Sequence, residues 1–310
     1  MDGVTDAPMR YITAKYGRPD FLFSEFVNVD ALHFAVGERR ARLLKSLIKA
    51  REVGELAYKP TEVAQIFGNN IEHFQEAAEL IESLGFDEID INMGCPAHKV
   101  EEQGSGAGLI RTPKLAQEII KAVQSHTSLP VSVKTRIGVE EEVVESWMET
   151  LMEVTPARIT VHGRTLRQMY TGHADWEAIA RAATVVHKYG GVIFGNGDVI
   201  SRKQAEEYIN KYKVDGILIG RAAEGNPFVF TSDELPDWKI LQKVMLEHAK
   251  IYERVFGAGY FMPMRKHLAW YCKGFAGAVE LRMQLMQSNS AEEVGKLIGR
   301  CELRQKLFDM

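Results

Sequence analysis

The fold is decided by the stretch Ile89-Asp90-Ile91-Asn92-Met93-Gly94-Cys95-Pro96, in which an alternating strand leads directly into a glycine turn that carries a cysteine. A cysteine at the C-terminal tip of a strand can act as an acid, act as a nucleophile or simply pack. The other two cysteines, Cys272 and Cys301, lie far downstream without a short-range partner. Neither a zinc cluster nor a CxxC redox pair can be drawn, so no metal is expected.

Six other β-rich runs each lead into a helical stretch, as this strand does. They cover residues 21–29, 63–68, 131–137, 158–162, 192–195 and 216–219. Residues 71–84 and 113–123 carry apolar positions at helical spacing, and Pro113 suits a first helical turn. Seven strands separated by helices predict a parallel α/β fold, either a (β/α)8 TIM barrel or an open doubly wound sheet.

Polar or glycine-containing segments close nearly every one of these strands. They are residues 65–68, 92–95, 134–138, 162–165, 195–198 and 220–223. In a barrel the active-site residues come from the C-terminal ends of many strands. In an open sheet they lie mainly at the one point where the strand order reverses. The distribution of these segments therefore favours the TIM barrel.

The amino-acid composition changes after Pro227, where no further strand is predicted. Residues 236–256 and 264–308 are rich in Leu, Met, Lys, Arg and Glu and are predicted to be helical. We expect a barrel domain over residues 1–230 and a small helical domain over residues 231–310. The alternative is that these helices only brace the barrel.

Composition is that of an ordinary globular protein. Of the 310 residues, 45% are hydrophobic and 26% charged, and no apolar run approaches the roughly 20 residues needed to cross a bilayer. The start lacks the basic and apolar sections of a signal peptide. With three unpaired cysteines, these features predict a cytoplasmic monomer without a membrane partner. The net charge of −4, with a mildly basic tail, neither requires nor excludes nucleic acid.

Two glycine turns end the last two predicted strands. They are Gly195-Asn196-Gly197-Asp198 and Gly220-Arg221-Ala222-Ala223. Barrels commonly bind phosphate at these strand ends through backbone N–H groups, which glycine lets approach an anion closely. The pair predicts a phosphate-bearing ligand.

A cation and an imidazole accompany these turns. Lys134 alternates with apolar residues on its strand and should point to the barrel mouth, where it needs an anionic or electron-rich partner. A reduced flavin ring would supply one, and Gln65 could hydrogen-bond the same ring; the alternative partner is Asp90. His162 and Arg164 share one strand tip, where His162 is expected to contact the phosphate or the ring.

Cations and one aromatic residue recur in the tail at spacings that can share helical faces. They are Arg265, Lys266, His267, Tyr271, Lys273 and Arg282. Such a composition can bind a folded RNA, although solvated helices carry it too.

Taken together and in order, these motifs resemble the tRNA-dihydrouridine synthase family over essentially the whole chain. The matching segments are residues 3–6, 65–68, 92–96, 134–138, 161–165, 170–176, 195–198, 219–223, 225–227 and 265–267, with Tyr271. The resemblance implies an FMN-dependent reduction of uridine in tRNA, with NADPH as the electron donor. Cys95 would donate the proton to C5 of the uracil as a general acid.

The resemblance also assigns binding residues. It implies that FMN is held by Gln65, Lys134, His162, Asn196, Gly197, Asp198, Gly220 and Arg221. Asn92 and Arg136 would read the target base, once it is taken out of its stack. Arg265, Lys266, Tyr271 and Lys273 in the helical tail would bind the tRNA body.

One departure from the family concerns the start of the chain. Members usually have a full first strand ending in Ala-Pro-Met before the Gly-Val-Thr-Asp segment, and this chain begins at that methionine. We therefore expect a barrel whose first strand is largely missing. Two other functions stay open: a flavin-dependent barrel acting on a small molecule, and a non-catalytic tRNA-binding protein.

Overall fold

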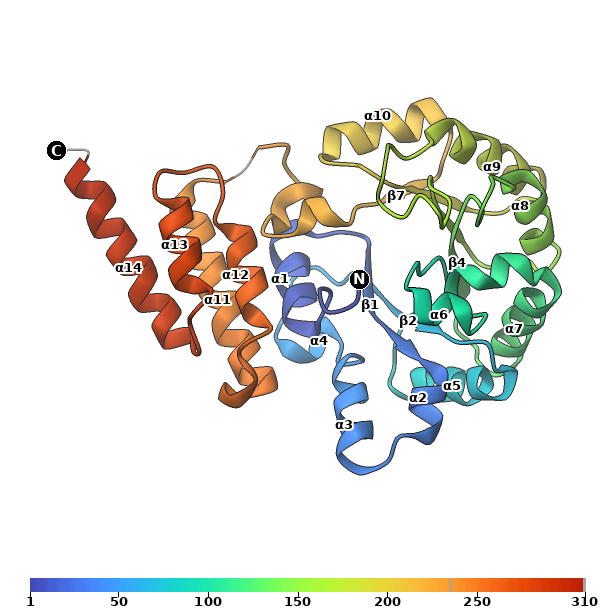
Figure 1. Ribbon diagram of the computed structural model, residues 1–310, viewed down its shortest axis with the longest axis horizontal. Helices are drawn as coiled ribbons and strands as arrows, with labels where there is room; N and C mark the ends of the chain where they lie inside the picture. Colours follow the sequence, from blue (N-terminus) through green and yellow to red (C-terminus); the bar gives the residue numbers. More distant parts are fainter. Residues whose placement is uncertain (235, 309–310) are drawn as a thin grey trace.

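A computed structural model describes residues 1–234 and 236–308 of the chain (Figure 1). Seven parallel strands form one sheet, in which each strand pairs with the next in chain order. They are β1 (Phe21–Asn28), β2 (Thr61–Phe67), β3 (Glu88–Met93), β4 (Val131–Arg136), β5 (Ile159–His162), β6 (Ile193–Asn196) and β7 (Gly216–Leu218). All seven predicted strands are confirmed, with ends shifted by two residues at most.

The sheet curls into most of a barrel, with helices on its outer side (Figure 1). These are α5 (Ile71–Ser83), α7 (Pro113–Ser125), α8 (Val144–Met152), α9 (Trp176–Lys188) and α10 (Arg202–Tyr212). The predicted TIM-barrel class is confirmed. No pairing between β1 and β7 occurs within the described residues.

Strand alternation separates the two faces of the sheet. Ile89, Ile91 and Met93 of β3 are fully buried in the core that the strands share with the outer helices. Asp90 and Asn92 alternate with them and take the inner face, where their side chains bond to those of neighbouring strands. The barrel interior is therefore lined with polar groups at its mouth, the end where the strands terminate.

Four helices lie outside the predicted pattern. They are α1 (Ala7–Gly17), before β1, and α2 (Val29–Phe34), α3 (Gly37–Lys45) and α4 (Ala50–Val53), between β1 and β2. Asp6 caps α1 by accepting a 2.8 Å hydrogen bond from the N–H of Met9. Short connecting helices are α6 (His98–Glu102) and the 3-10 turns η1 (Gly106–Arg111), η2 (Arg221–Ala223) and η3 (Pro227–Phe230).

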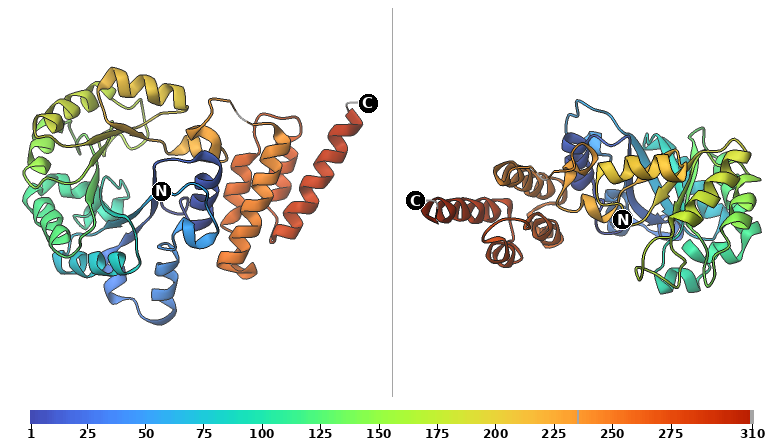
Figure 2. Two further views of the ribbon diagram at one scale, coloured as in Figure 1. Left: turned by 180° about the vertical axis from the view of Figure 1, so that it is seen from behind. Right: turned by 90° about the horizontal axis from the view of Figure 1, so that it is seen from above.

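The C-terminal part is helical, as predicted, and extends to one side of the barrel (Figure 2). It consists of α11 (Trp238–Phe256), the 3-10 turn η4 (Ala258–Tyr260), α12 (Met264–Tyr271), α13 (Ala278–Leu285) and α14 (Ala291–Phe308). Its core also includes Tyr11 and Ile12 of α1. The domain boundary at residue 230 stays a prediction. Among the described residues, none of the helices combines the length and apolarity needed to span a membrane.

An ion pair closes the end of the barrel opposite the mouth. Arg158, just before β5, forms a bidentate pair with Glu88 at the start of β3, and both side chains are buried. The Arg158 guanidinium also lies over the rings of Phe21, Phe23 and Phe194, 4.4–5.5 Å from their centroids. This cluster fills the barrel floor and leaves the mouth as the place for chemistry.

Candidate active site

A chain of hydrogen bonds fixes the polar side chains of β2, β3 and β4 at the mouth. Asn92 Nδ2 donates to Gln65 Oε1 at 2.9 Å, and Gln65 Nε2 donates to Asp90 Oδ2 at 2.7 Å. Ser132 Oγ donates to the other oxygen of Asp90 at 2.8 Å. Burial raises the pKa of Asp90 to about 6. Gln65 and Asn92, both predicted site residues, are thus held in one orientation through Asp90, which the sequence analysis considers only as a partner of Lys134.

Lys134 is the cation of the mouth. Burial, helped by the charge of Arg136, lowers the pKa of its ammonium to about 8. Asp90 raises this pKa through its charge, but its two oxygens accept from Gln65 and Ser132, and the described residues show no ion pair between Asp90 and Lys134. The backbone of Lys134 pairs with β3 and β5, but its ammonium has no hydrogen bond or ion pair to the described residues. A half-buried ammonium in this state calls for an anionic or electron-rich ligand.

Arg136 ties two strand tips together. Its Nε donates to the carbonyl of Gly94 at 2.8 Å, and its Nη1 donates to the carbonyls of Thr165 and Met169 at 3.0 and 3.3 Å. The guanidinium therefore holds the turn that carries Cys95 against the loop after β5. These contacts use Nε and Nη1, so Nη2 is the nitrogen that is placed to donate a hydrogen bond to a substrate.

Cys95 lies at the tip of β3 with 6% of its surface exposed. Burial raises the pKa of the thiol above its ordinary value, while Arg136 and Lys134 oppose that rise through their charges. Cys95 follows the end of β3, next to the end of β4, where Arg136 donates to the Gly94 carbonyl, so Cys95 lies at the same mouth. A thiol with a raised pKa stays protonated at neutral pH, which suits an acid and not a thiolate nucleophile.

A glycine holds Cys95 in place from the following loop. Gly106 has a φ of +58°, and a β-carbon there would lie 3.0 Å from Cβ of Cys95. The N–H of Ala107 donates to the carbonyl of Cys95 at 3.3 Å. Only glycine therefore satisfies both the backbone and the space at this position.

We expect Gly106→Ala to cost about 1–2 kcal/mol of stability through its left-handed backbone and also to displace Cys95. Gly190→Ala is the matched control, because Gly190 has a φ of +72° but open space around it. Urea unfolding should show similar losses for both variants, whereas only Gly106→Ala should lower turnover. Equal turnover in the two variants would mean that this contact does not position the thiol.

The first predicted glycine turn closes β6. Gly197 and Asp198 have φ values of +130° and +56°, and a β-carbon on Gly197 would lie 2.5 Å from that of Ala174. Trp176 Nε1 donates to the Gly197 carbonyl at 3.0 Å, and Asn196 Nδ2 donates to the Leu218 carbonyl at 2.7 Å. These contacts hold the turn in place, and Gly197 adds no side chain over its own backbone, as a backbone anion site requires.

The second turn follows β7 and lies beside the start of the chain. The sulfur of Met1 would be 3.6 Å from a β-carbon on Gly220. The N-terminal amine donates to Thr5 Oγ1 at 2.8 Å, and burial lowers its pKa to about 5. Met1 therefore takes part in the wall of the mouth next to the predicted phosphate turn.

The carboxylate of Asp198 joins three elements. Arg164 donates to both of its oxygens at 3.1 and 2.7 Å, Arg221 donates at 2.8 Å, and the N–H of Ala174 donates at 2.9 Å. The carboxylate of Asp198, a predicted cofactor-binding residue, thus holds two arginines in place, and its contact with a cofactor stays a prediction. The buried anchor Arg164 was recognised in the sequence only as a cation near His162.

His162 lies against the Gly197 turn, where a β-carbon on Gly197 would be 3.2 Å from its ring. Burial and the charges of Lys134, Arg136 and Arg164 lower its pKa to about 2. The imidazole is therefore neutral and acts as a hydrogen-bonding group. This state agrees with a binding role and not with acid–base work.

The predicted tail residues do not form one surface. Tyr271 is 1% exposed and its hydroxyl lies 3.1 Å from His248 Nδ1, so the prediction that it contacts RNA is corrected: its side chain packs inside the helical core. Arg265 donates to the carbonyl of Ser288 at 2.9 Å. Lys266 reaches the barrel, 3.0 Å from where a β-carbon on Gly3 would lie. Lys273 is exposed.

Comparison with known proteins shows the family to which the chain belongs. Residues 1–308 match the family model described as Dihydrouridine synthase (Dus). The chain is 34% identical to a probable tRNA-dihydrouridine synthase of Staphylococcus epidermidis, covering 98% of this chain and 92% of the relative. It is 31% identical to probable tRNA-dihydrouridine synthase 1 of a Synechocystis species, covering 99% and 86%.

The barrel itself resembles a solved structure, morphinone reductase in complex with tetrahydroNAD. The TM-score is 0.51 at 12% identity, and the match covers 76% of this chain and 84% of the other. That likeness concerns the fold alone. By its sequence, over nearly its full length, the chain belongs to the dihydrouridine synthase family.

Proposed function

We propose that the protein reduces a uridine of tRNA to dihydrouridine, with FMN as its flavin and NADPH as the electron donor. Family membership and the names of the relatives support the reaction and the tRNA substrate. The observation that carries the proposal is that one mouth holds both the half-buried ammonium of Lys134, which has no hydrogen bond or ion pair to the described residues, and the thiol of Cys95, whose raised pKa keeps it protonated. A tRNA substrate also favours a cytoplasmic enzyme, and we propose that it acts as a monomer.

The residues at the mouth fit a flavin mononucleotide. The turn at Gly197 and its neighbour at Gly220 offer backbone to a phosphate, and the side chain of Arg221 adds a cation. Lys134 offers charge to the ring, and Gln65 keeps a second N–H beyond the one given to Asp90. When bound, FMN reduced by NADPH supplies the hydride for C6 of the uracil.

The protein's own part in the reaction is to orient the base and to supply a proton. Asn92, held by Gln65 and Gly94, and Arg136, through Nη2, are the groups placed to bind the uracil edge. Cys95 then donates its proton to C5. Because the thiol pKa is raised, the proton is present at neutral pH without a further base.

The proposal is tested with purified protein, FMN, NADPH and an unmodified tRNA transcript. Mass spectrometry of the digested RNA should show dihydrouridine formed in proportion to NADPH consumed. Protein that binds no flavin, or flavin-loaded protein that leaves the tRNA unchanged, would contradict it. The first result points to a non-catalytic RNA-binding protein, and the second to an oxidoreductase for a small molecule.

Flavin affinity should depend on the charge of Lys134. With a pKa of about 8, the ammonium is present at pH 7 and lost by pH 9, so FMN retention should fall over that range. Lys134→Met should bind FMN about 10- to 100-fold more weakly at pH 7, the loss expected for a hydrogen bond to a charged group. The affinity of the Lys134→Met variant for FMN should not change between pH 7 and 9. Equilibrium dialysis measures both, and parallel pH curves would exclude this role for Lys134.

A further inference from the structure

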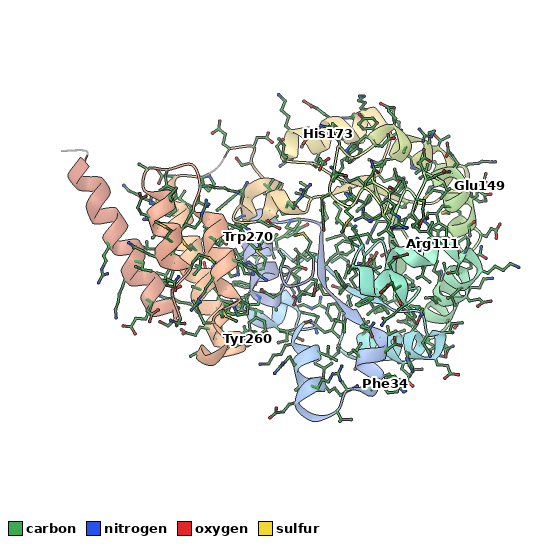
Figure 3. The ribbon with its side chains drawn as sticks, viewed as in Figure 1. Phe34, Arg111, Glu149, His173, Tyr260 and Trp270 are labelled. Atoms are coloured by element: carbon green, nitrogen blue, oxygen red, sulfur yellow. The ribbon has the colours of Figure 1, made fainter. Side chains whose placement is uncertain are left out.

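A pocket of about 250 Å³ opens where the barrel meets the helical part. Trp270, which is labelled in Figure 3, is one of its lining residues. One wall comes from η2 and the residue after it, and the other from α12 and α13. The lining residues are Arg221, Glu224, Ala269, Trp270, Lys273 and Arg282. The pocket lies outside the chain of hydrogen bonds that holds Gln65 and Asn92.

Close backbone contact fixes the two walls relative to each other. Gly225 has a φ of +67°, and a β-carbon there would lie 2.3 Å from the carbonyl of Trp270. The ammonium of Lys273 donates to the carbonyl of Glu224 at 3.2 Å, and Arg282 donates to the carbonyl of Cys272. The pocket is therefore a formed feature of the fold and not a gap between mobile side chains.

The charge in the pocket calls for an anion. Three cations, Arg221, Lys273 and Arg282, line the pocket with one carboxylate, Glu224, and Arg221 is also paired with Asp198. Lys273 and Arg282 therefore exceed Glu224 by one positive charge. Burial lowers the pKa of Lys273, so its ammonium would gain from an anionic partner. A bound phosphate would satisfy the excess positive charge.

The lining of the pocket also includes an aromatic side chain, Trp270 of α12. Trp270 meets the ring of His267 edge to face, with centroids 5.0 Å apart, and its side chain lines the pocket. An indole beside cations is the combination that binds nucleotides, because a base stacks on the ring while the cations pair with phosphate. A volume of about 250 Å³ is below the roughly 300–1,000 Å³ of pockets that enclose a whole small ligand. The pocket suits one unit of a longer polymer.

We infer that this pocket binds one nucleotide of the tRNA, with its base on Trp270 and its phosphate between Lys273 and Arg282. The inference rests on the proposed function and adds a positioning site to it. Arg221 connects the pocket to the mouth, since its side chain lines the pocket and also donates to Asp198. A nucleotide held here sets the distance between the RNA body and the base that reaches Cys95.

Binding of unmodified tRNA to the flavin-loaded protein tests the aromatic wall. Trp270→Ala should weaken binding about 5- to 100-fold, the range for loss of one base stack. Trp270→Phe keeps an aromatic face and should bind nearly as the parent protein does. The chain has four tryptophans, and the RNA-induced quenching of their fluorescence should shrink in Trp270→Phe if Trp270 is the stacked ring.

Salt dependence tests the cations. Lys273→Gln and Arg282→Gln should each reduce the slope of log affinity against log salt by about one. Lys188→Ala is the charge-matched control, because Lys188 is exposed at the end of α9, on the side of the barrel opposite the mouth. Its slope should equal that of the parent protein.

Flavin content and the rate of flavin reduction by NADPH separate this inference from the proposed function. Both should be unchanged in the Trp270 and Lys273 variants, whose side chains lie outside the flavin cradle. Unchanged tRNA affinity and salt slope in these variants would overturn the pocket assignment even if the protein makes dihydrouridine. Weakened binding in a protein that makes no dihydrouridine would uphold the pocket and refute the reaction.

Discussion

Cys95→Ala is expected to lower the rate of dihydrouridine formation about 100- to 10,000-fold, the range for loss of a positioned general acid. The thiol is the protonated group at the mouth, because burial keeps its pKa above the ordinary value. Alanine fills most of the same space but offers no proton. Single-turnover formation of dihydrouridine in tRNA, with the flavin already reduced, measures this step directly.

Flavin content and flavin reduction by NADPH should stay unchanged in Cys95→Ala, because the thiol is not part of the phosphate turns. Cys272→Ala is the matched control: it removes a second buried thiol, at the end of α12, and should leave the rate unaltered. A Cys95→Ala enzyme that reduces uridine at the parent rate would assign the proton to another donor. Water or Arg136 would then be the next groups to test.

The strands and their polar tips could be predicted from the sequence because both are local signals. Alternation in residues 88–93 sends Ile89 and Ile91 to the helices and Asp90 and Asn92 to the interior, as the structure shows. Once the strands are parallel and in order, their C-terminal ends must meet. Gln65, Lys134 and His162 therefore come together at one mouth without any knowledge of side-chain contacts.

Long-range partners could not be predicted in this way. The sequence predicts Asp198 as a cofactor-binding residue but does not indicate that its carboxylate pairs with Arg164 and Arg221, which come from two other strand ends. Tyr271 has the composition of a binding residue, yet packing of α12 on α11 buries it against His248. In each case tertiary packing decides which face of a helix or turn is covered, and the spacing of residues does not.

The helices around the barrel also differ in whether local sequence signals could predict them. Apolar spacing identified α5 and α7, whose inner faces pack on the sheet. The helix α1 carries little segregation of apolar and polar residues, because it is buried on several sides between the barrel and α11. A helix that is enclosed in this way has no polar face, so its sequence does not show the 3.6-residue spacing of apolar positions by which a helix is recognised.

Arg158→Ala is expected to reduce the free energy of unfolding by about 3–5 kcal/mol, the cost of leaving one partner of a buried ion pair alone. Glu88 would keep its charge at the barrel floor, where it is 5% exposed, without the bidentate donor that now satisfies it. The rings of Phe21 and Phe194 would also lose the cation between them. Urea unfolding followed by circular dichroism measures the change.

Two further variants show whether the isolated charge is the cause. The double replacement Glu88→Leu with Arg158→Met removes both charges and fills the floor with apolar atoms, so it should recover most of the loss. Arg202→Ala breaks an exposed pair with Glu206 and should change stability little. If the double variant is as unstable as Arg158→Ala, the stacking of the guanidinium on the phenylalanine rings, and not its pairing with Glu88, holds the barrel floor together.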